Sequence, residues 1–152
     1  MEFDELIDGF AAKYGIEGLA AKDGTAVLRF DDVSAAFICD ESGASVTVAA
    51  EIGEPPPCGD SGRFGNLLLQ ANHLFRGTGG ATLSRDPESG AYCIARRLPL
   101  ASLSLDEFSA HVAKIVSQAE TWRDAMETFR QAEDAADDGA EESPSPFDAL
   151  RV

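Results

Sequence analysis

The sequence predicts an α+β domain in which helices pack against an antiparallel sheet, in the order α-β-β-β-α-β-β-α. Apolar residues recur at helical spacing in the segments that read as helices. The segments that read as strands are short and are separated by turns of a few residues. Turns this short join antiparallel strands, because a parallel pair needs a long crossover. At 152 residues the chain has the length of one domain with its own core.

The first predicted helix starts at Phe3 and ends at Gly15, a residue type that commonly stops helices. Its apolar positions follow the helical repeat, with charged residues between them. They are Phe3, Leu6, Ile7, Phe10 and Tyr14.

Three strands are predicted next, at residues 25–30, 33–39 and 45–52. In the first, Ala26, Leu28 and Phe30 share one face, whereas Val27 and Arg29 share the other. Residues 31–32 and 40–43 carry the Asp, Ser and Gly that favour turns. Prolines at 55–57 cannot continue a strand, so the sheet should break there.

A second helix is predicted over residues 61–75, with Asp60 or Ser61 as its N-cap. Its apolar face is broad and needs cover on more than one side; it comprises Phe64, Leu67, Leu68, Ala71, Leu74 and Phe75, widened by Leu69. Two interpretations stay open: burial within its own domain, or division between the core and a subunit interface. Gly62 and Gly65 weaken its start, so the helix could begin later.

A hairpin and a third helix complete the domain. Strands are predicted at residues 79–84 and 91–98, around a turn at 86–90. Ser104 and Glu107 form a capping box, with Leu103 and Phe108 placed as a hydrophobic staple. One apolar seam then continues along the helix through Leu105, Phe108, Val112, Ile115, Ala119, Trp122, Met126 and Phe129. We interpret this seam as core packing rather than as a coiled coil.

The domain is expected to span residues 1–130, and residues 131–152 to form an acidic, disordered tail. The tail carries many acids and no apolar face. Its end, residues 147–152, is apolar enough to dock, although a frayed terminus is the simpler interpretation.

Charge and cysteine usage limit the partners and the compartment. The chain has 27 acids and 12 bases, a net charge of −15, which disfavours nucleic acid and anionic membranes as partners. No segment approaches the roughly 18 apolar residues that span a bilayer, and the acidic N-terminus is unlike a secretory signal. Cys39, Cys58 and Cys93 are odd in number and have no CxxC spacing. We therefore expect a cytoplasmic protein with reduced thiols and no membrane insertion.

Motifs for catalysis or metal binding are not found, so we expect no cofactor, no metal and no enzyme activity, although activity is unsupported rather than excluded. His73 and His111 have no partner at metal-ligand spacing. Cys39 and Cys93 fall in predicted strands, and no base adjoins Cys58. The glycine-rich residues 77–80 lead into a strand and lack the Lys-Ser/Thr of a phosphate loop.

Several motifs occur in an order that resembles the class I type III secretion chaperones, the Tir-chaperone family. They are LLLQANHL at 67–74, GATLSRD at 80–86, LPL at 98–100, LD at 105–106 and AETWR at 119–123. The resemblance covers residues 2–130. It implies a homodimer formed by the second helix and the following strand, through Leu67, Leu68, Ala71, Leu74, Phe75, Ala81 and Leu83.

The resemblance also implies binding of the extended N-terminal segment of a secreted effector, which is kept soluble and secretion-competent. Candidate groove residues lie on the first helix and first two strands: Phe3, Leu6, Phe10, Leu28, Phe30, Phe37 and Ile38. Core packing is the competing interpretation for most of them. The acidic tail departs from the family pattern, and one hypothesis is that Phe147 and Leu150 shield the groove until an effector arrives.

Two alternatives remain. A chaperone-like regulatory module would bind a folded cytosolic protein, and a small hydrolase or transferase would have an unrecognised site. Exposed apolar surface favours the secretion chaperone over both.

Overall fold

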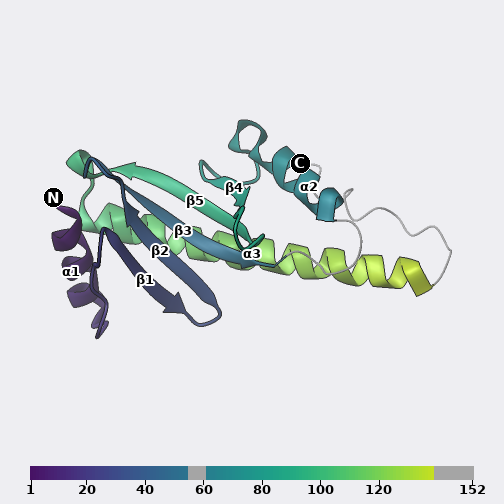
Figure 1. Ribbon diagram of the computed structural model, residues 1–152, viewed down its shortest axis with the longest axis horizontal. Helices are drawn as coiled ribbons and strands as arrows, with labels where there is room; N and C mark the ends of the chain where they lie inside the picture. The colour runs from purple at the N-terminus through teal and green to yellow at the C-terminus, as the bar shows by residue number, and fades with distance from the viewer. Residues whose placement is uncertain (55–60, 139–152) are drawn as a thin grey trace.

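A computed structural model describes residues 1–54 and 61–138, and its described part contains a five-stranded antiparallel sheet with helices (Figure 1). The elements are α1 (Phe3–Tyr14), β1 (Thr25–Phe30), β2 (Val33–Cys39), β3 (Ser45–Gly53), α2 (Ser61–Asn72), β4 (Thr82–Arg85), β5 (Tyr92–Pro99) and α3 (Leu105–Asp138), with 3-10 helices η1 (His73–Phe75) and η2 (Leu100–Ser102). The predicted α+β class and element order are confirmed. The interpretations of Cys58 and of residues 139–152 lie outside the described residues.

The sheet order is β1-β2-β3-β5-β4, so β5 lies between β3 and β4. The tight turns predicted after β1 and β2 make the first three strands a meander, in which Val27 pairs with Ala36 and Ala36 with Ala49. After β3 the chain leaves the sheet for α2 and returns as the β4–β5 hairpin. The edge strands are therefore β1 and β4.

Strand β4 begins at Thr82, later than the predicted start at residue 79. The reason is local backbone geometry, since Gly79 and Gly80 have φ values of 57° and 94°. Left-handed φ values are outside the β region, and glycine adopts them without a Cβ clash. Residues 79–80 are therefore part of a turn rather than of the strand.

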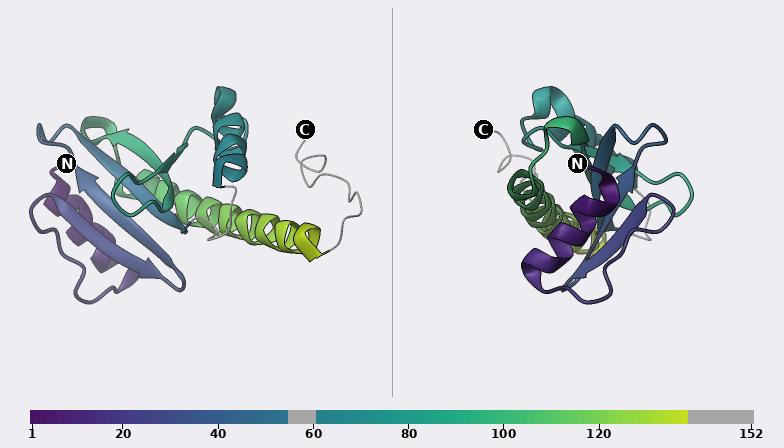
Figure 2. Two further views of the ribbon diagram at one scale, coloured as in Figure 1. Left: turned by 45° about the vertical axis from the view of Figure 1, so that its right-hand side comes forward. Right: turned by 90° about the vertical axis from the view of Figure 1, so that its left-hand side faces the viewer.

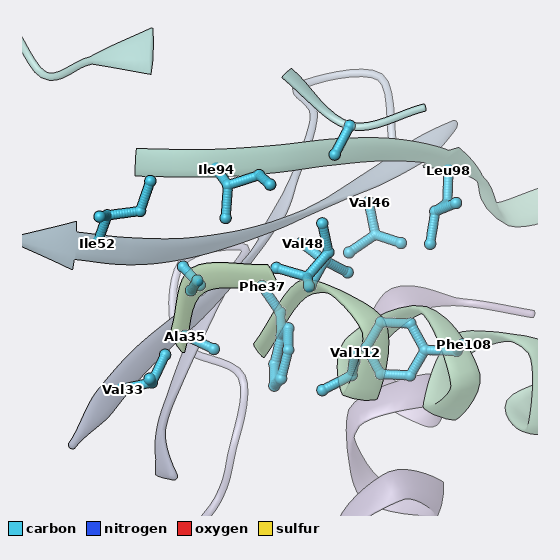
Figure 3. Packing of buried hydrophobic residues seen from close by; sticks show 14 of the residues in the cluster. Val33, Ala35, Phe37, Val46, Val48, Ile52, Ile94, Leu98, Phe108 and Val112 are labelled. Carbon is cyan, nitrogen blue, oxygen red and sulfur yellow. The ribbon is translucent and has the colours of Figure 1, made fainter. Parts of the chain in front are cut away.

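Helices α1 and α3 pack on the same face of the sheet (Figure 2). Phe37 of β2 contacts rings from both helices, at centroid distances of 5.8 Å to Phe10 and 5.3 Å to Phe108. Phe10 and Phe108 are 5.4 Å apart, so the three rings form one cluster. Around it, β-branched residues of the strands fill the remaining volume (Figure 3).

Helix α3 begins at the predicted capping box and continues well past the sheet (Figure 1). The Ser104 N–H donates to Glu107 Oε2 at 2.9 Å, and the Glu107 N–H donates to Ser104 Oγ at 3.2 Å. The predicted seam is buried from Phe108 to Phe129. At 34 residues, α3 ends at Asp138 and so includes the start of the predicted tail at residue 131. Alanine and glutamate, both strong helix formers, explain the continuation to the residue before Gly139.

Arg123 ties α3 to the ends of the strands. Its Nε donates to the carbonyl oxygen of Ile52 at 3.0 Å, and its Nη1 donates to that of Asp32 at 2.8 Å. These bonds connect the β1–β2 turn and the end of β3 to one helix, which fixes the sheet edge relative to α3.

Candidate interaction surfaces

The end of α2 is joined to β4 by a single side chain. The Asn72 Nδ2 donates to the carbonyl oxygen of Leu83 at 2.9 Å, and Asn72 Oδ1 accepts from the Leu83 N–H at 2.9 Å. Because β4 is an edge strand, both backbone groups of Leu83 would otherwise be open to another strand. The amide therefore blocks this edge and positions the end of α2.

Two bulky residues in left-handed conformation follow Asn72. Leu74 has φ 54° and ψ 27°, and Phe75 has φ 55°. Sparsely populated conformations of this kind cost roughly 1–3 kcal/mol each in non-glycine residues. The turn nevertheless exposes 69% of Leu74 and 55% of Phe75. A strained turn that presents apolar side chains to water is typical of a surface that a partner covers.

The loop after this turn is held by side chains from β5 and α3. Gln118 Nε2 donates to the carbonyl oxygen of Thr78 at 2.6 Å. Lys114 Nζ and Arg96 Nη1 donate to the carbonyl oxygen of Gly79 at 3.3 and 3.4 Å. The Leu74–Phe75 turn therefore sits between two anchored points, Asn72 and this loop.

The residues expected at a homodimer interface range from buried to exposed in the single chain. Leu68, Ala81 and Leu83 are buried within the single chain, Leu67 and Ala71 are half-buried, and Leu74 and Phe75 are exposed. Leu69 was not among the expected interface residues, yet it is 69% exposed on the same helix. We call the accessible set, Leu67, Leu69, Ala71, Leu74 and Phe75, the α2 surface.

The residues expected to bind an effector also fall into a buried group and an accessible group. Phe3, Leu6, Phe10 and Phe37 are buried at 6%, 0%, 3% and 0% exposure, so in the single chain they pack the core. Leu28 and Phe30 are half-buried and Ile38 is 42% exposed. Val27, which was not among the candidates, is 63% exposed. We call Val27, Leu28, Phe30 and Ile38 the β1–β2 surface.

The β1–β2 surface lies on both faces of one sheet edge. Val27 pairs with Ala36 and Thr25 pairs with Ile38, so Val27 and Ile38 share the face away from the helices. Leu28 and Phe30 alternate with Val27 and pack toward the core side. An extended chain beside β1 would place its alternate side chains next to these two apolar pairs.

The turn that carries β2 into β3 is organised by Asp40. Its carboxylate accepts from the Ala44 N–H at 2.8 Å and from Ser45 Oγ at 2.9 Å, and it pairs with Arg97. Desolvation acts to raise the pKa of Asp40. Hydrogen bonds from Ser45, Ala44 and Ser42 outweigh it and hold the pKa well below its usual range.

The two strand cysteines and His111 also have shifted pKa values. Burial raises the pKa of the Cys39 and Cys93 thiols, which makes them poor nucleophiles. Burial, Arg96 and Lys114 lower the pKa of His111. Among the described residues, no cluster of three or more His, Cys, Asp and Glu side chains could hold a metal ion. None of the described helices combines the length and apolarity needed to cross a membrane.

The fold and the two apolar surfaces define a protein-binding domain. The model of the Tir chaperone protein (CesT) family matches residues 5–123, which is most of the chain. The chain therefore belongs to the Tir chaperone protein family. A Chlamydia pneumoniae protein, CPj0713/CpB0740, is 28% identical over 121 residues, covering 78% of this chain and 92% of the relative.

Solved structures share the fold. A chain of the ExsC–ExsE complex has a TM-score of 0.70 at 22% identity, covering 81% of this chain and 92% of that one. A chain of the HopA1–SchA chaperone–effector complex has a TM-score of 0.64 at 21% identity, covering 79% of this chain and 91% of that one. A chain of the Yersinia pestis type III secretion chaperone SycH in complex with a fragment of YscM2 has a TM-score of 0.59 at 14% identity, covering 78% of this chain and 98% of that one.

Proposed function

We propose that this protein is a type III secretion chaperone that binds the extended N-terminal segment of a secreted effector and keeps it soluble. Membership of the Tir chaperone family supports the chaperone role. The observation that carries extended binding is the sheet edge formed by β1 and β2, where Val27 of β1 and Ile38 of β2 are exposed on one face and Leu28 and Phe30 of β1 are half-buried on the other. An added strand gains backbone hydrogen bonds along such an edge, and its alternate side chains bury these apolar pairs.

Asn72 supports β1 rather than β4 as the receiving edge. Both backbone groups of Leu83 in the short strand β4 already bond to the Asn72 amide. A strand added at β4 would have to displace that amide and the end of α2. Strand β1 is the longer of the two edge strands, at six residues against four, and it requires no such displacement.

We further propose that the protein works as a cytoplasmic homodimer, without catalysis, and that the α2 surface forms the interface. Leu69, Leu74 and Phe75 are the large apolar side chains that this surface exposes, at 69%, 69% and 55%. Burial of these side chains by a second copy would stabilise the dimer by about 25 cal/mol for each Å² of apolar surface removed from water. Such burial would offset the strain of the Leu74–Phe75 turn.

The experiment is co-purification of the tagged full-length chain from its native cell, with mass-spectrometric identification of the bound protein. We expect a secreted protein whose first ~50–100 residues bind on their own as an unfolded fragment. Binding through a folded domain instead would make this protein a regulatory module and would contradict the proposal. A turnover screen on the purified chain tests the expected absence of catalysis.

A further inference from the structure

Strand β1 has only a short stretch of open backbone, although it is an edge strand of six residues. In an antiparallel ladder, successive residues point their backbone groups alternately toward the neighbouring strand and away from it. The Cys39 N–H donates to the carbonyl oxygen of Gly24 at 2.8 Å, so Gly24 and every second residue after it point toward β2. Thr25, Val27 and Arg29 therefore point toward the open edge.

A tight turn before β1 already uses the first of these three residues. The Thr25 N–H donates to the carbonyl oxygen of Lys22 at 3.0 Å, and the Lys22 N–H donates to that of Thr25 at 2.8 Å. Asp23 and Gly24 form the turn with φ values of 52° and 72°, the two left-handed values that a type I′ turn requires. An added strand can therefore pair with β1 only beyond Thr25.

The edge that stays open consists of Val27 and Arg29, which we call the β1 window. Among the described residues, no backbone bond outside the strands involves either of them. Arg29 Nε donates to the carbonyl oxygen of Asp31 at 2.9 Å, which ties its side chain to the turn after the strand. Val27 is 63% exposed and Leu28, on the opposite face, is half-buried. An incoming strand therefore meets an apolar side chain on each face.

The half of the chain that carries this window is strongly acidic. Residues 1–54 contain twelve acids and three bases, whereas residues 61–119, which include α2 and β4, contain four acids and six bases. Acids are therefore few in the elements where two copies would meet, which limits repulsion between them. They are many in the elements around β1, where the resulting field attracts a cationic partner.

Exposed carboxylates flank the window at both ends. Asp31 and Asp32 follow β1 directly, and Asp23 lies in the turn before it; all three are exposed. Lys22 and Arg29 offset part of this charge. An extended chain from Asp23 to Asp31 spans about 27 Å. A segment of about seven residues laid along the window would therefore end near a carboxylate on each side.

We propose that the β1 window receives a short extended segment of the bound effector, with apolar residues at its centre and Lys or Arg at both ends. The proposal rests on the secretion-chaperone role proposed above and names the sequence that this role selects. The centre of the segment gains backbone hydrogen bonds and covers Val27 and Leu28. Its basic ends meet the carboxylates of Asp23, Asp31 and Asp32.

The test uses the full-length chain and three synthetic peptides. The first is Lys-Lys-Ile-Val-Ile-Lys-Lys; the second replaces its lysines with glutamates, and the third replaces its apolar residues with serines. Fluorescence anisotropy of the labelled peptides measures each affinity at low salt. We expect the first to bind at least about tenfold more tightly than either of the others, the factor that 1.4 kcal/mol represents. Similar affinities for the first peptide and either control would overturn the proposal, as would no binding of the first.

Amide hydrogen exchange followed by NMR locates the peptide on the chain. In the protein alone we expect slow exchange at Thr25 and fast exchange at Val27 and Arg29. Binding of the first peptide should slow Val27 and Arg29 at least about tenfold and leave Thr25 unchanged. Binding without this slowing would overturn the proposal. Slow exchange at both residues before the peptide is added would overturn it too, because the protein itself would then occupy the edge.

Two charge reversals supply the matched variants. Asp32→Lys and Glu88→Lys change the net charge equally at exposed positions, but Glu88 lies in the turn between β4 and β5. Affinity for the first peptide should fall about fivefold in Asp32→Lys and less than about twofold in Glu88→Lys, at low salt. Equal losses would overturn the proposal. A secreted protein that co-purifies while the first peptide fails to bind would reject the window and leave the chaperone role standing.

Discussion

The side chain of Asn72 makes the two hydrogen bonds to Leu83 that an adjoining strand would make, both at 2.9 Å. One amide thus ends the sheet at β4 and fixes the helix that carries the α2 surface. The same contact makes β1 the edge at which another chain can pair.

Replacing Asn72 should therefore destabilise the domain. In Asn72→Ala, both backbone groups of Leu83 lose their partner in a partly buried position, which costs about 1–3 kcal/mol of unfolding free energy. Urea denaturation followed by Trp122 fluorescence measures this loss. Asn66→Ala, an exposed position on the same helix, is the control and should change stability by less than about 0.5 kcal/mol. Equal losses in the two variants would argue against the strand-like role.

The strain at Leu74 separates folding from association. Leu74→Gly removes the cost of the left-handed conformation, so the monomer should become more stable by about 1 kcal/mol. The same change removes an exposed apolar side chain, so the dimer should weaken. Denaturation at low concentration measures the first effect, and sedimentation equilibrium measures the second. A dimer unaffected by Leu74→Gly would place the interface elsewhere. Gln70→Gly, also exposed but helical, should lower monomer stability instead.

Charge at the β1–β2 surface should weaken effector binding. Ile38→Lys puts a cation where we expect an apolar contact. Burying an aliphatic side chain contributes about 1.5–3 kcal/mol, so the affinity for the co-purified effector should fall about tenfold or more. Ser34→Lys introduces the same charge on the same strand and face, and it should have little effect. Isothermal titration with both variants makes the comparison. Similar losses would indicate a general charge effect rather than a contact at Ile38.

Asp40 should make stability depend on pH in the acidic range. The pKa of Asp40 is held below its ordinary value of 3.8, so the folded state binds this proton less tightly than the unfolded state does. The stabilisation is therefore complete above about pH 5 and is lost as pH falls toward the lower folded-state pKa. Asp40→Asn should be less stable than the wild type at pH 6, with the gap narrowing toward pH 2. Denaturation at several pH values checks this, with the exposed Asp124→Asn as the control. A gap that stays constant with pH would refute the assignment.

Local signals in the sequence predicted much of the fold. The Ser104–Glu107 box, the turn residues after β1 and β2, and the stop at Gly15 each act within a few residues, so their chemistry is visible in the sequence. The end of α2 was harder to predict from the sequence. Leu74 and Phe75 continue the apolar spacing of the helix, yet the chain leaves the helix at Asn72 because its amide bonds to β4.

The candidate sites depended on what covers each apolar residue, which periodicity does not reveal. Phe10 and Phe37 read as groove candidates, but Phe108, distant in sequence, buries them both. The alternation of the strand placed Val27 on the face opposite Leu28 and Phe30, and only the pairing with β2 places it on the same face as Ile38. The residues 131–138 have no apolar seam, so the helix they form was missed, although alanine and glutamate indicated it.

The position of β5 between β3 and β4 has a consequence for the order of folding. The β1–β2–β3 meander closes through turns of a few residues, whereas Val46 must pair with Leu98 across a long intervening segment that contains α2. Pairings between distant residues form slowly, because loop entropy opposes them. Helix α2 and strand β4 can join earlier, because Asn72 and Leu83 are close in sequence and β4 and β5 form a local hairpin. We therefore expect two local units, the β1–β2–β3 meander and the α2–β4–β5 segment, to form first and to join late through β3 and β5, so that the α2 surface takes its final position on the core in the last step of folding.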